Sequence, residues 1–113
     1  MSLTQAEIAP GVVRLALAGR LDAAGLAQVE LGFTALATAG SNHVLVDLSG
    51  VTFCASLGLR LIIANARVVQ RRGRVMALYG AQPAVAEVLQ TVALDQLMPI
   101  LGTEAAALAA LPG

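Results

Sequence analysis

The chain has 113 residues, of which 58% are hydrophobic, 12% charged and 3% aromatic. This length suits one ordinary domain, and the high hydropathy with little charge excludes a disordered chain. Seven arginines balance seven acidic residues, so the formal net charge is +0. This neutrality argues against a nucleic-acid partner. Because the sequence contains no lysine, it also excludes a Walker-type phosphate loop and a Schiff-base lysine.

The sequence contains a single cysteine, Cys54, and a single histidine, His43. An intrachain disulfide, a Cys-based zinc site and a two-histidine metal site are therefore excluded. The two residues lie at opposite ends of one predicted strand and loop, with no third group to orient them. We therefore expect no Cys–His catalysis, no metal and no cofactor, and we expect Cys54 to be a small buried hydrophobe.

The sequence also bears on location. The N-terminal segment lacks the basic region and apolar run of a secretory signal. No apolar stretch reaches the roughly 18 residues needed to cross a bilayer. We expect a cytoplasmic protein that does not insert directly into a membrane.

The first third of the chain predicts a hairpin and a helix. Apolar residues alternate from Val12 to Gly19, which is typical of a strand, and Leu3 to Ile8 can form its partner across a Pro10-Gly11 turn. Apolar residues then recur every three or four positions from Ala23 to about Ala39, which indicates an amphipathic helix. Asp22 precedes this helix and is its expected N-cap.

The rest of the chain predicts alternating strands and helices. Residues 44–48 form a nearly continuous apolar run, which suits a strand buried on both faces of a parallel sheet. We expect Asp47, near the end of this strand, to bond amides of the loop that follows. The further elements expected are a loop over Ser49–Ala55, a helix over Ser56–Arg72, a strand over Arg74–Tyr79, a helix with Pro83 in its first turn, a short strand over Met98–Leu101 and a helix capped by Thr103 that ends near Leu111.

The resulting order is β-β-α-β-α-β-α-β-α. It predicts one α/β domain over residues 1–113, with a mostly parallel mixed sheet of about five strands and about four helices. Ligand sites in such sheets form beyond the carboxyl ends of the strands. The order therefore predicts a ligand site at the segment after Leu48 and the start of the second helix. The unpaired N–H groups at that helix start tolerate a phosphate.

Five segments resemble STAS domains, in particular bacterial anti-sigma factor antagonists. They read GRLDAAG at 19–25, VDLSGVTF at 46–53, ASLGLRLI at 55–62, RRGRVMALYG at 71–80 and QPAVAEVLQTVALDQLMPI at 82–100. The resemblance implies a STAS-like fold and a non-enzymatic regulator that binds a kinase-like anti-sigma factor. It also implies that phosphorylation of a serine at the start of the second helix sets release and capture of that partner.

This sequence departs from the family at the phosphorylated turn. The family pattern is Asp-Ser-Ser/Thr-Gly, whereas residues 55–58 read Ala55, Ser56, Leu57 and Gly58. Leu57 stands at the acceptor position and has no hydroxyl, so we predict that the usual switch is absent. Ser56 can cap the second helix, or it can serve as a surrogate phosphoacceptor. Leu57 can pack inward, or it can stand on the surface as a partner contact.

Other residues have two readings each. Asp22 matches the acid that the resemblance places near the phosphoserine pocket, and it is also an N-cap. Gly58 indicates a close approach of backbone or close helix–sheet packing. Arg60, Arg67 and Arg71 share one helical face, which is either simply solvated or a contact for an acidic partner.

Three functional hypotheses follow. The leading one is a cytoplasmic STAS regulator that binds a kinase-like anti-sigma factor through Asp22, Ser56, Leu57, Gly58 and Arg60. The second is an accessory STAS subunit of a lipid-handling ABC transporter, bound to its ATPase subunit, which needs no phosphoswitch. The third is binding of a nucleotide or small molecule at the helix N-terminus, which the lack of a Gly-rich phosphate loop disfavours.

Overall fold

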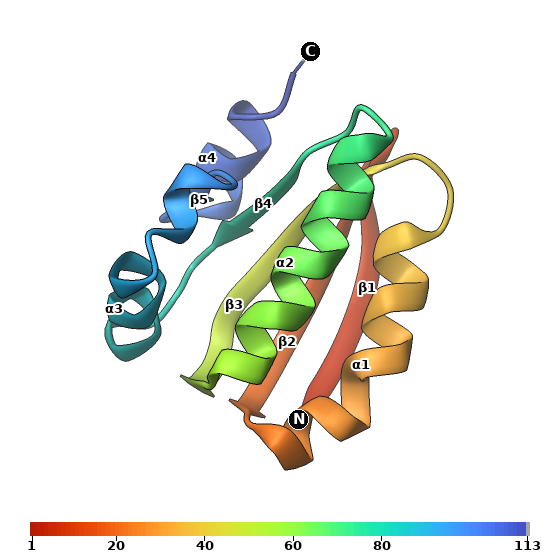
Figure 1. Ribbon diagram of the computed structural model, residues 1–113. Helices are drawn as coiled ribbons and strands as arrows, with labels where there is room; N and C mark the ends of the chain where they lie inside the picture. Colours follow the sequence, from red (N-terminus) through yellow and green to blue (C-terminus); the bar gives the residue numbers. More distant parts are fainter. Residues whose placement is uncertain (113) are drawn as a thin grey trace.

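A computed structural model describes residues 1–112, which contain one five-stranded sheet in the order β1-β2-β3-β4-β5 (Figure 1). The first pair is antiparallel and the other three pairs are parallel. The strands are β1 (Ser2–Ala9), β2 (Val12–Leu21), β3 (His43–Cys54), β4 (Met76–Tyr79) and β5 (Ile100–Leu101). The mixed sheet with an antiparallel hairpin at one edge confirms the predicted fold class.

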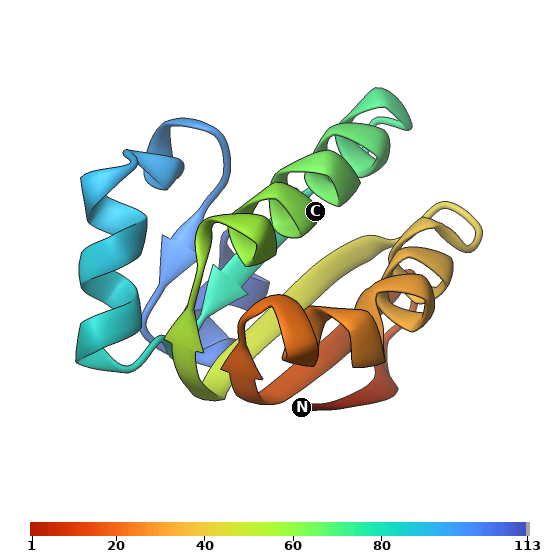
Figure 2. The ribbon, with the colours of Figure 1, turned by 60° about the horizontal axis from the view of Figure 1, so that its bottom comes forward.

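The described residues also form four α-helices that cover the sheet unequally. They are α1 (Ala23–Thr38), α2 (Ser56–Arg71), α3 (Pro83–Thr91) and α4 (Glu104–Ala109), with a short 3-10 helix over Leu94–Gln96. The helices α1, α2 and α3 contribute to one large aliphatic core, whereas α4 packs in a second, smaller core with residues of β2, β3 and β4. Figure 2 shows α1 and α2 lying side by side across the same face of the sheet.

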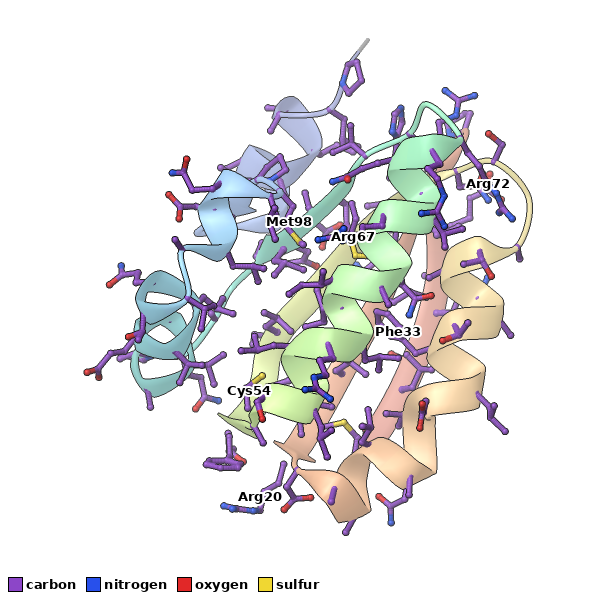
Figure 3. All side chains as sticks on the ribbon, in the orientation of Figure 1. Arg20, Phe33, Cys54, Arg67, Arg72 and Met98 are labelled. Atoms are coloured by element: carbon purple, nitrogen blue, oxygen red, sulfur yellow. The ribbon has the colours of Figure 1, made fainter. Side chains whose placement is uncertain are left out.

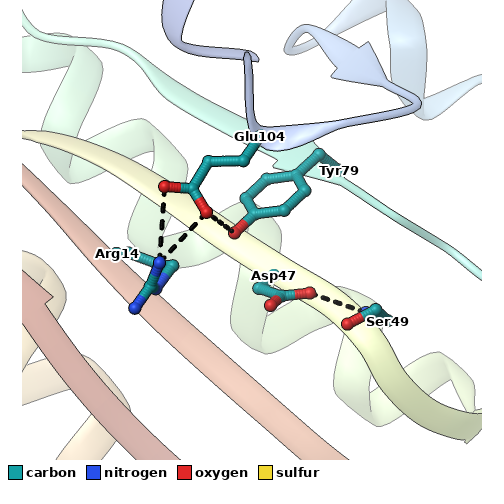
Figure 4. A network of polar contacts seen from close by, with 5 residues as sticks. All are labelled: Arg14, Asp47, Ser49, Tyr79 and Glu104. Carbon is teal, nitrogen blue, oxygen red and sulfur yellow. Dashed lines mark hydrogen bonds and ion pairs between the residues drawn. The ribbon is translucent and has the colours of Figure 1, made fainter. Parts of the chain in front are cut away.

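Polar contacts fix α4 to its face of the sheet (Figure 4). The Arg14 guanidinium lies 3.0 Å from a Glu104 carboxylate oxygen, and the Tyr79 hydroxyl donates to the same carboxylate at 3.0 Å. On the same face, the Asp47 Oδ1 atom accepts a hydrogen bond of 2.8 Å from the Ser49 amide, which confirms the expectation for Asp47. Arg14 and Tyr79 therefore attach α4 through Glu104, whereas Asp47 bonds within its own strand.

The prediction of a loop over Ser49–Ala55 is wrong, because most of this segment is strand. Strand β3 continues to Cys54, because β2 is also long and pairs with it up to Leu21 opposite Cys54. Two register shifts in this pairing break the regular alternation of buried and exposed residues, which disguised the strand in the sequence. The turn before α2 is consequently reduced to one residue, Ala55.

Other boundaries differ by smaller amounts. Strand β4 begins at Met76 rather than Arg74, β5 is limited to Ile100–Leu101, and α4 ends at Ala109 rather than near Leu111. The 3-10 turn after α3 was not predicted, and it follows Ala93, whose φ of 52° interrupts the helix. Among the residues described, no helix combines the length and apolar character that crossing a bilayer requires.

Candidate functional site

The candidate site lies where β2 and β3 end and α2 begins. The Ala55 amide donates to the Leu21 carbonyl at 3.0 Å, which ties the turn to the end of β2. Ala55 is the N-cap of α2, and no side chain caps this helix. The prediction that Ser56 is the N-cap is therefore wrong: Ser56 is the first helical residue and is exposed. The physical reason is the length of β3, which runs to Cys54 and enters the helix through Ala55 alone, so the cap falls one residue earlier than predicted.

Gly58 determines how the first turn of α2 sits on the sheet. A Cβ atom at this position would lie 2.5 Å from the Leu21 Cγ atom, well inside van der Waals contact, so only glycine permits this approach. Gly58 is buried and Leu21 is 0% exposed, which confirms the expectation of close packing. The neighbouring Leu57 points away from this contact and is 41% exposed. Of the two readings of Leu57, the structure therefore supports the surface one.

Asp22 begins α1 at the same edge of the sheet. Its Oδ1 atom accepts a hydrogen bond of 2.9 Å from the Gly25 amide, which confirms the N-cap. Its Oδ2 atom accepts one of 3.2 Å from the Arg20 Nε atom. The Gly25 amide, and then Arg20, lower the pKa of Asp22. The carboxylate is thus charged at neutral pH and already engaged by its own chain.

Two residues that the sequence reasoning missed extend this edge. The Arg20 guanidinium lies over the Phe53 ring, 4.4 Å from its centroid, and Phe53 is 41% exposed. Figure 3 places Arg20 and Cys54 at the same end of the sheet, beside the start of α2. Phe53 and Leu57 are both exposed and stand four positions apart in the sequence, on either side of the turn before α2, and exposed aromatic and aliphatic area of this kind is what protein interfaces use. Recognition of β3 as a long strand would have placed Phe53 beside Arg20.

Leu57 and Arg60 also line a groove between α1 and α2. The groove has a volume of about 410 Å³. Its floor contains Asn65, whose side-chain amide donates to the Thr34 hydroxyl at 3.2 Å and to the Leu61 carbonyl at 2.9 Å. The lining residues are Leu26, Glu30, Thr34, Thr38, Leu57, Arg60, Leu61, Ala64, Asn65 and Val68.

His43 is the first residue of β3 and Cys54 is the last, so the two form no pair. Burial raises the pKa of the Cys54 thiol, which is the opposite of what a nucleophile needs. The His43 Nδ1 atom accepts a hydrogen bond of 3.0 Å from the Val75 amide at the far end of the strand. Within residues 1–112, no cluster of three or more His, Cys, Asp or Glu side chains could hold a metal ion.

The family described as "Mlab, STAS domain" matches residues 4–102. The chain belongs to the STAS domain family. It is 27% identical over 110 residues to BtrV of Bordetella bronchiseptica, a candidate anti-sigma factor antagonist. The matched region covers 97% of this chain and 94% of that protein. It is 28% identical over 99 residues to an anti-sigma F factor antagonist of Paenibacillus polymyxa, with 87% of this chain and 85% of that protein covered.

Solved structures agree with this assignment. An anti-sigma-factor antagonist (STAS) domain protein of Planctomyces limnophilus superposes with a TM-score of 0.84 at 24% identity, covering 96% of each chain. This likeness confirms the STAS fold. The family assignment from the sequence is also confirmed, and the chain is a STAS domain similar to anti-sigma factor antagonists.

Proposed function

We propose that this STAS domain is a non-enzymatic regulator that binds a kinase-like anti-sigma factor in the cytoplasm. The binding edge comprises the ends of β2 and β3 and the first turn of α2, with Asp22, Ser56, Leu57 and Arg60 as its residues and the buried Gly58 holding the turn in place. The observation that carries the proposal is Leu57, a large apolar side chain that stays 41% exposed because Gly58 packs directly against Leu21. The names of the two relatives support an anti-sigma factor as the partner.

The proposal includes constitutive binding. Leu57 stands at the position where the resemblance places a phosphorylated hydroxyl, and a leucine side chain forms no phosphate ester. Binding is then controlled by the amount of protein or by another ligand. Ser56 is exposed and caps no helix, which leaves its hydroxyl accessible to a kinase. Phosphorylation of Ser56 would contradict constitutive binding. Intact-mass measurement after incubation with the partner and ATP, followed by mapping of the peptide over 53–60, detects it.

The partner interaction is tested with a pair of matched variants. Leu57→Glu places a charge in the proposed edge, and Leu108→Glu places the same charge on α4, where Leu108 is 39% exposed. Purified kinase-like anti-sigma factors from the same genome are titrated against each variant by calorimetry. We expect Leu57→Glu to weaken binding by about 30-fold, a hot-spot loss of about 2 kcal/mol, and Leu108→Glu to bind like the wild type. Equal binding by Leu57→Glu would contradict the proposed edge.

A second candidate function is an accessory subunit of a lipid-handling ABC transporter. Leu57 favours it equally, because such a subunit needs no phosphorylated residue in the first turn of α2. The same variants discriminate between the two functions when the titrant is an ABC ATPase subunit. Binding of that subunit, with loss in Leu57→Glu and no binding of any anti-sigma factor, would replace the leading proposal with this one.

A further inference from the structure

Helix α2 carries a row of arginines without counter-charges. Arg60, Arg67 and Arg71 are separated by seven and four residues, which places them within about 40° of one another and along about 16 Å of the helix. The helix contains no acidic residue, and all three arginines are exposed. Within residues 1–112 none of the three forms an ion pair, whereas Arg14 and Arg20 do. Figure 3 shows Arg67 beside α2 in the direction of Met98, with which it lines a pocket.

An apolar row lies next to these arginines. Leu57, Ala64 and Val68 also recur at seven and four residues, and with Leu61 they form the α2 wall of the groove described above. The α1 wall consists of Leu26 and two threonines, and its single charged residue is Glu30. We name the groove together with Arg60, Arg67 and Arg71 the α2 surface. It is an apolar channel with Arg60 in its lining and with Arg67 and Arg71 farther along the exposed side of α2, where Arg67 also borders a pocket with Leu97 and Met98.

We propose that the α2 surface binds an acidic amphipathic segment of a protein partner. The apolar side of such a segment fills the groove, and its carboxylates lie over the arginines, whose guanidinium groups hold carboxylates with two parallel hydrogen bonds. The inference rests on the proposed function in that the partner is a protein, and it extends contact along the helix beyond the first turn. The observation that favours this occupant is the charge pattern, because the cations are concentrated on one helix of a chain whose formal net charge is +0.

A membrane surface is a less suitable occupant. Helices that lie on membranes present several large apolar or aromatic side chains next to their basic residues. On the α2 surface Leu57 is the single large hydrophobic residue that is strongly exposed, at 41%, among the residues described. The α2 surface therefore suits an acidic peptide segment better than a membrane, and vesicles serve as the alternative ligand in the titration.

The test is an NMR titration of the isotope-labelled full chain. The probe is a synthetic helical peptide with leucines along one face and glutamates along the next, and the reference is a scrambled peptide of equal composition. The variant Arg67→Gln/Arg71→Gln removes two cations outside the first turn of α2. The matched control Ala84→Glu/Gln90→Glu lowers the net charge by the same two units at exposed positions of α3.

We expect saturable shift changes in α1 and α2 for the amphipathic peptide. The double arginine variant should weaken binding about tenfold, as expected for the loss of two exposed ion pairs, while the α3 control changes it less than about twofold. The inference is overturned if the scrambled peptide binds equally well, if the control weakens binding as much as the variant, or if vesicles of phosphatidylcholine and phosphatidylglycerol shift these residues more than the peptide does.

The experiment separates this inference from the proposed function. Arg67 and Arg71 lie outside the proposed edge, and Leu57→Glu is measured against the anti-sigma factor itself. If that factor depends on Leu57 but binds Arg67→Gln/Arg71→Gln as tightly as the wild type, the proposed function stands and the inference fails. If the peptide binds through the arginines while no anti-sigma factor binds, the inference stands and the proposed function fails.

Discussion

The contact between Gly58 and Leu21 makes a quantitative prediction for Gly58→Ala. In a helix this exchange ordinarily stabilises by up to about 1 kcal/mol, because glycine loses more backbone entropy on folding. Here the new Cβ atom would lie 2.5 Å from the Leu21 Cγ atom and 2.6 Å from its Cδ2 atom. Leu21 is 0% exposed and is packed in the large core, so overpacking of about 1–3 kcal/mol outweighs the gain. We expect a net loss of about 1–2 kcal/mol.

A second helix glycine supplies the control. A Cβ atom at Gly32 in α1 would meet its nearest neighbour, the Leu3 Cδ2 atom, at 3.4 Å, which is an ordinary contact. Gly32→Ala should therefore stabilise the protein by about 0.5–1 kcal/mol. Urea denaturation monitored by circular dichroism measures both variants. If Gly58→Ala is as stable as Gly32→Ala, the reasoning that Gly58 holds α2 against β2 is wrong.

Three further predictions concern single side chains. Leu57→Ser should accept one phosphate from a kinase-like partner and ATP, detected by intact mass, whereas residue 57 of the wild type stays unmodified. Burial, and then the charge of Arg74, lower the pKa of the buried His43, so the unfolded chain takes up the proton first and stability falls as pH drops below about 6.5. Urea titrations at pH 7.5 and about pH 5 should show this loss, and His43→Asn, which keeps an acceptor for the Val75 amide, should reduce it. Burial, and then the bond to Glu104, raise the pKa of Tyr79 above its usual value near 10. Its stabilisation is complete at neutral pH and lost in strong alkali, so the native protein should show no phenolate absorbance at about pH 10 while the urea-unfolded chain does.

The candidate site was predicted in part from the sequence. The cap at Asp22 and the close packing of Gly58 were predicted, because each depends on the chemistry of one side chain next to a strongly periodic helix. Ser56 was given the wrong role, since a serine before an amphipathic helix is typical of an N-cap and only the extension of β3 to Cys54 moves the cap to Ala55. Phe53 was missed for the same reason.

The sequence by itself determined the elements whose pattern is local. The spacing of apolar residues predicted α1, α2 and the buried start of β3, and the order of elements then predicted a mixed, mostly parallel sheet. The absence of a hydroxyl at Leu57 likewise needs no coordinates. Pairing between distant strands, the outward direction of Leu57 and the groove between α1 and α2 were decided only by the tertiary structure. These features depend on contacts between residues such as Leu21 and Gly58, which are far apart in sequence, so no short window of sequence encodes them.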